Sequence, residues 1–200
     1  MNLILAAFGS AQTVFGIYFK LQSFVFMPVF GLNNGMVPII AYNYGAGHKD
    51  RVIKTIKHSV AYGVGIMFAG LLAMHIFPAQ LMRMFDAEES LIAIGAPALE
   101  TISLSFVFAG FCIVAGSVFQ ALGNGVYSMI VSVARQMCVL LPVAKLLSLS
   151  GEVTLIWWAF PIAELASVLL TSYFLVRIYR KVICHIGEPV VYRVKFLSVE

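Results

Sequence analysis

Five long apolar stretches constrain the fold of this chain more than any other feature of its sequence. They cover residues 13–41, 52–77, 91–120, 126–147 and 154–177. Each is longer than the about 20 residues that a helix needs to cross a membrane, and none alternates as a barrel strand would. Only 11% of the 200 residues are charged, whereas soluble domains carry about 25%. The sequence therefore predicts an all-α polytopic membrane protein with five transmembrane helices.

The distribution of Lys and Arg predicts how these helices are oriented. If the chain crosses the membrane five times, the first loop, the third loop and the C-terminus lie on one side. That side carries nine of the 13 Lys and Arg residues, whereas the opposite side carries only Arg83 and Lys145. Positive residues accumulate on the cytoplasmic side of membrane proteins. We therefore expect a multi-pass protein of the cell membrane, with its N-terminus outside and a cytoplasmic tail over residues 182–200.

Several classes of function receive no support from the sequence. The three cysteines show no CxxC spacing and the four histidines no i, i+4 pairing, so we expect no metal site. We find no basic groove for nucleic acid, no nucleophile–base set and no phosphate-binding loop, so we expect neither an enzyme nor a bound cofactor. No Lys or Arg precedes Lys20, so we expect no cleaved signal peptide.

The end of the first apolar stretch is rich in residues that shape a helix. Gly31 and Gly35 are one turn apart, so another helix can approach closely there. Pro38 removes a backbone donor and favours a kink. Gly45 and Gly47 favour the left-handed conformation that ends a helix. We assign helix-packing and hinge roles to Pro28, Gly31, Gly35, Pro38, Gly45 and Gly47.

The second apolar stretch has a comparable set of small residues at intervals of four. These are Ala61, Gly65, Ala69 and Ala73. Small residues on one face let two helices pack closely, so we expect this stripe to contact a neighbouring helix.

Four ionisable residues, Lys20, Glu100, Arg135 and Glu164, are predicted to lie at membrane depth, where facing lipid costs a few kcal/mol each. Arg135 and Glu164 both lie about ten residues inside their spans, near the midplane. We therefore expect an ion pair or a shared polar network between them, with either a functional or a purely structural role. Glu100, near Pro97, is a candidate proton or cation site or an ordinary hydrogen-bonding group. Lys20 is expected to extend towards the membrane surface.

Amide side chains near the span interiors complete the set of candidate cavity residues. Phenylalanines surround them, and aromatic walls with a few carboxylates suit organic cations, although phenylalanine is equally common on lipid-facing surfaces. The candidates for a transport cavity or polar network are Gln22, Asn33, Asn34, Glu100, Gln120, Arg135 and Glu164.

A series of short motifs resembles one family of transporters. The motifs are residues 19–28 (FKLQSFVFMP), 31–35 (GLNNG), 43–47 (NYGAG) followed by Arg51, 119–123 (FQALG), Arg135-Gln136 before Pro142, and 157–161 (WWAFP) before Glu164. In this order and spacing, residues 5–181 resemble the multidrug and toxic compound extrusion (MATE) family.

The resemblance implies a secondary antiporter that exports organic, often cationic, drugs in exchange for Na⁺ or H⁺. Such proteins have twelve helices in two lobes, and the five spans here look like helices eight to twelve. Residues 1–181 would then form part of a C-terminal lobe. Some members carry an aspartate on the tenth helix, but the corresponding place here is near Phe111, so the resemblance does not assign an ion site to Glu100.

Alternating access requires two bundles to move around a central site. We therefore expect that this chain exports nothing by itself and acts with an N-terminal lobe or a second half-transporter. One alternative is a truncated, nonfunctional membrane remnant. Another is a lipid-linked-sugar flippase of the same wider superfamily, which would have a more basic cavity than Lys20 and Arg135 provide.

Overall fold

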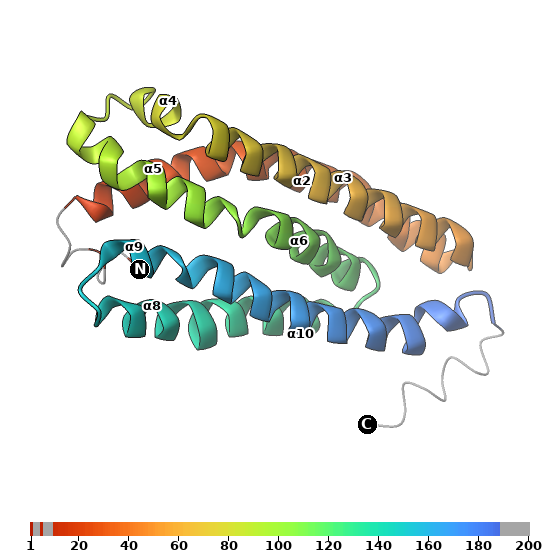
Figure 1. Cartoon of the computed structure of the whole chain (residues 1–200). Coiled ribbons are helices and arrows are strands. Elements are labelled where there is room, and N and C mark those ends of the chain that lie inside the picture. The colour runs from red at the N-terminus through yellow and green to blue at the C-terminus, as the bar shows by residue number, and fades with distance from the viewer. Residues whose placement is uncertain (2–4, 6–9, 189–200) are drawn as a thin grey trace.

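The computed structural model of the chain describes residues 1, 5 and 10–188, and this part contains helices and no β-strand. The long helices run alongside one another in an elongated bundle (Figure 1). In chain order the elements are α2 (Ala11–Gly45), α3 (Lys49–Ile76), α4 (Pro78–Arg83), α5 (Glu89–Ser103), α6 (Phe106–Ala121), α7 (Gly125–Val133), the π-helix η2 (Ala134–Leu140), α8 (Leu141–Ser148), α9 (Val153–Trp157), α10 (Ala159–Lys181) and the 3-10 helix η3 (Ile183–His185).

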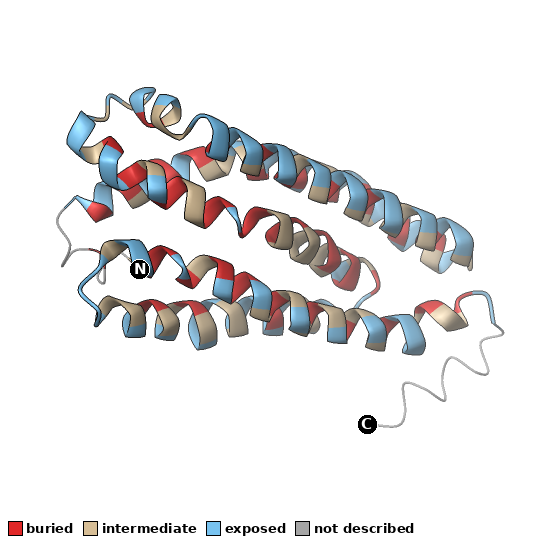
Figure 2. Cartoon of the chain, in the orientation of Figure 1, coloured by how far each residue is buried: buried red, intermediate tan, exposed pale blue. Residues whose placement is uncertain are grey.

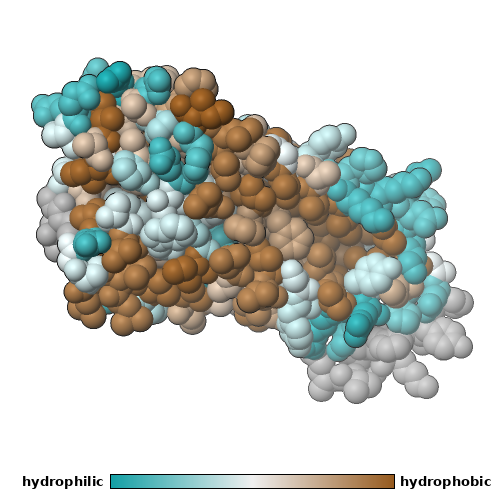
Figure 3. Space-filling view, viewed as in Figure 1, coloured by the Kyte–Doolittle hydropathy of each residue, from teal (hydrophilic) through white to brown (hydrophobic). Residues whose placement is uncertain are grey.

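The lengths and compositions of these helices confirm the membrane fold predicted from the sequence. Four segments are long and apolar enough to cross a membrane: Ala11–Gly45, Lys49–Ile76, Gly125–Ser148 and Val153–His185. The pair α5 and α6 makes a fifth span if the two are taken together. Hydrophobic residues cover the middle of the bundle and hydrophilic residues gather at its ends (Figure 3). Buried residues lie on the sides of the helices that face one another (Figure 2).

Glycines on α3 and α6 allow these two helices to approach closely. A Cβ atom added at Gly63 would lie 2.6 Å from Cγ2 of Val114 and 3.7 Å from the carbonyl oxygen of Gly110. A Cβ added at Gly110 would lie 3.1 Å from the carbonyl oxygen of Gly63. The contact therefore depends on the absence of both side chains.

The helix contact predicted for the small residues of the second span is not made in this bundle, so that prediction is wrong. Ala61, Gly65, Ala69 and Ala73 are all exposed. The buried face of α3 instead carries Gly63, Met67, Gly70 and Met74. Small residues occur on more than one face of this helix, and their spacing does not indicate which face meets a neighbour.

The two prolines to which we assigned hinge roles lie within one continuous helix, α2. Pro28 and Pro38 both lie inside α2, which runs on without a break. Transmembrane helices tolerate proline because nearby groups satisfy the backbone that it leaves unpaired. Gly31 and Gly35 are exposed, with nothing within 4 Å of an added Cβ, so the close contact predicted for them is not made within the described residues.

Helix α2 ends in a Schellman motif, in which Gly47 alone takes the left-handed conformation that the sequence predicted for both Gly45 and Gly47. The prediction for Gly45 is wrong, because Gly45 remains helical and Gly47 takes the left-handed conformation with φ 74°. The His48 amide donates to the carbonyl of Asn43 at 2.9 Å, and the Gly47 amide donates to Tyr44 at 3.2 Å. These bonds satisfy carbonyls that the helix end would leave free.

Two of the predicted spans are interrupted. Residues 91–120 form α5 and α6, which meet at a bend of 46°. At this bend, hydroxyl groups donate to helix carbonyls: Ser103 to Glu100 at 3.0 Å and Ser105 to Ile102 at 2.6 Å. Serine competes for backbone hydrogen bonds in this way and so favours a bend. Residues 154–177 fall across α9 and α10, which are separated at Trp158.

The beginning of the predicted cytoplasmic tail packs against the bundle. Lys49 at the start of α3 donates from Nζ to the carbonyl of Cys184 at 2.8 Å. Ile183 and Ile186 are buried, and a Cβ added at Gly187 would lie 3.1 Å from the carbonyl oxygen of Gly47. Residues 182–188 therefore cover the turn between α2 and α3, while residues 189–200 of the predicted tail lie outside the described residues.

Candidate functional site

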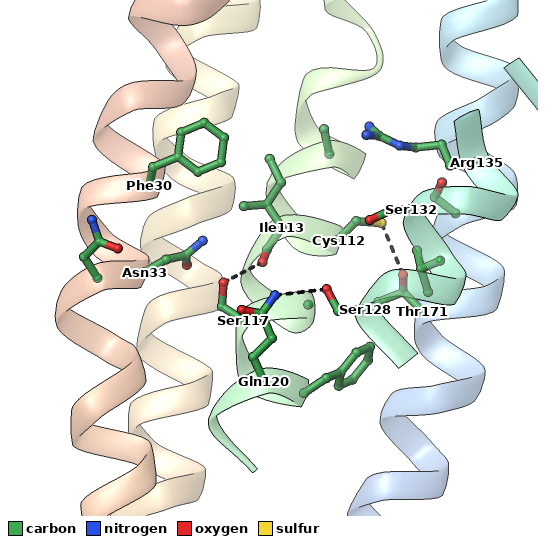
Figure 4. A pocket seen from close by; sticks show the side chains of 16 residues that line it. Phe30, Asn33, Cys112, Ile113, Ser117, Gln120, Ser128, Ser132, Arg135 and Thr171 are labelled. Atoms are coloured by element: carbon green, nitrogen blue, oxygen red, sulfur yellow. Dashed lines mark hydrogen bonds between the residues drawn. The ribbon is translucent and has the colours of Figure 1, made fainter. Parts of the chain in front are cut away.

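A cavity of about 360 Å³ lies between α2, α6, α7 with η2, and α10. Figure 4 shows Asn33 on α2, Gln120 on α6, and Ser128 and Arg135 on the neighbouring segment, all around one space. Its lining is rich in amides and hydroxyls, and it includes no Asp or Glu. We call it the amide cavity. It is lined by Phe30, Asn33, Asn34, Ala109, Cys112, Ile113, Gly116, Ser117, Phe119, Gln120, Ser128, Val131, Ser132, Arg135, Ser167 and Thr171.

A second cavity of about 210 Å³ lies beside the first and has aromatic walls. The rings of Phe15 and Tyr18 lie 6.0 and 5.9 Å from the ring of Phe160. Gln22 and Glu164 supply polar groups. We call this space the aromatic cavity. It shares two wall residues, Ala109 and Arg135, with the amide cavity.

Arg135 and Glu164 form the ion pair that the sequence predicted. Nη1 of Arg135 donates to Oε1 of Glu164 at 2.5 Å. The Glu164 side chain is 8% exposed, whereas that of Arg135 is 37% exposed. Oε2 of Glu164 is buried without a hydrogen-bond partner in the described part of the chain. The pair is therefore asymmetric, because the carboxylate is buried whereas the guanidinium is partly exposed.

The π-helix η2 places Arg135 between the two cavities. It spans Ala134–Leu140, and Pro142 is the second residue of α8, which follows it. Proline lacks an amide proton and crowds the carbonyl of the preceding turn, so a wider turn accommodates it. Such π-turns within helices are frequent at functional sites.

Hydroxyl groups line the amide cavity, and the sequence reasoning did not identify them. Gln120 donates from Nε2 to Oγ of Ser128 at 3.2 Å, and Thr171 donates to Sγ of Cys112 at 3.6 Å. Ser167 donates to the carbonyl of Ala163 at 3.0 Å. Helical spacing offered a signal, because Ser128, Ser132 and Arg135 share one face, as do Glu164, Ser167 and Thr171.

Six of the seven polar candidates line one or both cavities. These are Gln22, Asn33, Asn34, Gln120, Arg135 and Glu164. Glu100, the seventh, lies half-buried on α5 and lines neither cavity. Lys20 also lies apart, with Nζ 5.6 Å from the ring centre of Phe85 in the turn after α4. No group of three His, Cys, Asp or Glu side chains suited to a metal ion occurs among residues 10–188.

Comparison with known proteins identifies the family of this chain. The family model MatE matches residues 1–146, which is most of the sequence. The chain belongs to the MATE family. The resemblance inferred from the motifs is thereby confirmed. Because this is a family of transporters, the chain is not an enzyme.

Curated relatives of this MATE chain include multidrug export proteins of staphylococci. It is 28% identical over 175 residues to multidrug export protein MepA of Staphylococcus haemolyticus, which covers 86% of this chain and 38% of that protein. It is 28% identical over 166 residues to MepA of Staphylococcus aureus strain N315, covering 82% of this chain and 36% of that protein. The chain thus spans less than two-fifths of the length of these relatives.

Solved structures with the same fold are also MATE transporters. The multidrug transporter DinF-BH is 33% identical, with a TM-score of 0.78 over 89% of this chain and 40% of that protein. The Vibrio cholerae transporter VcmN in its bent form is 18% identical, with a TM-score of 0.81 over 88% of this chain and 41% of that protein. At that lower identity the likeness shows the fold alone.

Proposed function

We propose that this chain forms one bundle of a secondary active antiporter that exports organic, often cationic, drugs in exchange for Na⁺ or H⁺. Two polar-lined cavities between membrane-crossing helices are the observation that carries this proposal. The amide cavity, at about 360 Å³, falls within the range of about 300–1,000 Å³ that suits drug-sized ligands, and polar groups inside a membrane are costly and therefore commonly functional. Family membership and the names of the staphylococcal relatives support the same function.

A second bundle is proposed to cover the open side of the amide cavity. Asn34 lines this cavity and is exposed on α2, close to the exposed Gly31 and Gly35. Hydrocarbon cannot satisfy the amide of Asn34, and the glycines let another helix approach. We propose that residues 1–181 correspond to a C-terminal lobe. An N-terminal lobe or a second half-transporter would then complete the chamber within the lipid bilayer.

Particular residues are proposed to carry the transport steps. Asn33, Asn34, Gln22 and Gln120 would hydrogen-bond the substrate, and Arg135 and Glu164 would form the polar network between the cavities. Among the described residues, Glu164 is the one acidic residue that lines either cavity, so it is the better candidate for coupling to H⁺ or Na⁺ than Glu100. In the part of the chain that the structure describes, Arg135 is the one basic residue lining these cavities, which fits drug export better than the more basic site expected of a flippase.

The orientation is proposed to follow the positive-inside rule, with the C-terminus in the cytoplasm. In a cysteine-free background, Glu152→Cys and Lys181→Cys place single thiols in the α8–α9 turn and at the end of α10. A membrane-impermeant maleimide should label Glu152→Cys in intact cells and Lys181→Cys only after permeabilisation. The reverse pattern would show that the orientation is inverted.

The transport proposal is tested with ethidium accumulation in an efflux-deficient bacterial host. We compare this chain alone with a chimera in which it replaces the matched segment of MepA from S. haemolyticus. The chimera should lower accumulation, and the chain alone should not. Gly35→Leu in the chimera should impair export, whereas Gly65→Leu, on a different exposed glycine, is the control. A membrane-inserted chimera without export would refute the transport role, and export by the chain alone would refute the need for a second bundle.

A further inference from the structure

Of the Arg135–Glu164 ion pair, the amide cavity is lined by the positively charged member alone. The Glu164 side chain is 8% exposed and that of Arg135 is 37% exposed. Arg135 uses one hydrogen bond for Glu164 and donates to no other acceptor in the described part of the chain. A guanidinium has five N–H donors, so most of its donors remain available to a ligand. Arg135 lines both cavities, whereas Glu164 lines only the aromatic cavity, so a molecule in the amide cavity meets the N–H groups of Arg135 and no carboxylate.

The rest of the lining adds no competing negative charge. The amide cavity contains no Asp or Glu, and its hydroxyls on Ser117 and Ser167 donate to carbonyls of their own helices. The aromatic cavity adds the packed rings of Phe15, Tyr18 and Phe160. A flat ring system can lie against the half-buried rings of Phe15 and Phe160 while an attached acceptor group reaches Arg135.

We propose that Arg135 binds a carboxylate of the substrate, so that this bundle favours zwitterionic aromatic compounds over purely cationic ones. The inference rests on the proposed transport function and specifies its substrate class. Arginine is suited to this role because its planar fork matches a carboxylate with two parallel hydrogen bonds. The substrate cation would be held by groups outside the amide cavity, since that cavity has no carboxylate.

Glu164 weakens the binding of a substrate carboxylate to Arg135. Its carboxylate neutralises the guanidinium and occupies one N–H group, so a substrate carboxylate competes with it. Removing the charge of Glu164 should therefore strengthen binding of a carboxylate, whereas removing the charge of Arg135 should weaken it. A purely structural pair predicts no such opposite effects, because loss of either member would only disturb the fold.

A matched pair of dyes tests the proposal. Rhodamine B carries a free carboxylate on the phenyl ring attached to its cationic xanthene, and its ethyl ester has the same ring system without the negative charge. The whole chain is placed in phosphatidylcholine nanodiscs and titrated with each dye by fluorescence anisotropy, with empty nanodiscs subtracted. The measured quantity is the ratio of acid to ester affinity, which is insensitive to a uniform loss of folded protein.

The wild-type chain should prefer the acid. Glu164→Gln, which can still accept a hydrogen bond from Arg135, should raise the ratio by about tenfold. Arg135→Gln should lower the ratio to about one. Arg83→Gln and Glu89→Gln are matched controls, because they disrupt an ion pair of 2.9 Å that lies exposed outside both cavities. These control variants should leave the ratio unchanged.

Three results would overturn the proposal. They are an unchanged ratio in Arg135→Gln, shifts in the same direction in both cavity variants, and no binding of either dye to the wild-type chain. Ethidium export by the chimera together with an unchanged ratio would refute the substrate class and leave the transport function standing. Opposite shifts in the ratio without export by the chimera would support the site and refute the transport function.

Discussion

Replacing Gly63 by alanine should destabilise the bundle, whereas the same change at Gly65 should not. The new Cβ at position 63 would lie 2.6 Å from Cγ2 of Val114, which is fully buried on α6. A β-branched side chain has one strongly preferred rotamer in a helix, so Val114 cannot turn away at low cost. At Gly65, two residues further along the same helix, an added Cβ meets nothing within 4 Å.

The expected effect of the Gly63 change is the difference between two opposing terms. Forcing an extra methyl group into a packed interface costs about 1–3 kcal/mol. Replacing glycine by alanine in a helix offsets about 0.5–1 kcal/mol of this. At the midpoints of these two ranges, we expect Gly63→Ala to lower the free energy of unfolding by about 1.3 kcal/mol. Gly65→Ala should leave it unchanged or raise it by up to about 1 kcal/mol.

The free energy of unfolding can be measured by titrating the detergent-solubilised protein with SDS. Tryptophan fluorescence reports the unfolding of the bundle, because Trp157 is fully buried, whereas the neighbouring Trp158 is already half-exposed in the folded chain. The same titration is applied to the wild-type chain and to the two alanine variants. If Gly63→Ala is as stable as the wild type, or if Gly65→Ala loses more stability, α3 does not pack on α6 through the face that contains Gly63.

Two further predictions use the same titration. In a double-mutant cycle, Arg135→Gln and Glu164→Gln should show a coupling of about 1–3 kcal/mol, because the two groups contact each other directly. Additive effects would mean that the pair contributes no direct interaction. Gly47→Ala should lower the free energy of unfolding by about 1 kcal/mol, since an L-residue is strained at the φ of 74° found there. Gly45→Ala, at a helical position with open space, is the matched control, and an equal loss there would contradict the assignment of the cap to Gly47.

The contact between Arg135 and Glu164 shows how much of the candidate site could be predicted from sequence. Charged groups at membrane depth must find partners, and helical rise alone placed both near the midplane. Glu100 met the same criterion of depth but lines neither cavity. Depth follows from counting residues along a span, whereas the direction in which a side chain points depends on how its helix is rotated.

The sequence by itself determined that this chain is an all-helical membrane protein, where its spans lie, and which family it resembles. The hydrocarbon of the membrane imposes these properties on each segment separately. Every span must form its own backbone hydrogen bonds and can carry few charged side chains. Only the tertiary structure decided that Gly63 rather than Gly65 meets α6, that a bend separates α5 from α6, and that Arg135 lies between two cavities. These features depend on contacts between helices far apart in the sequence, and the pattern of one helix alone does not specify them.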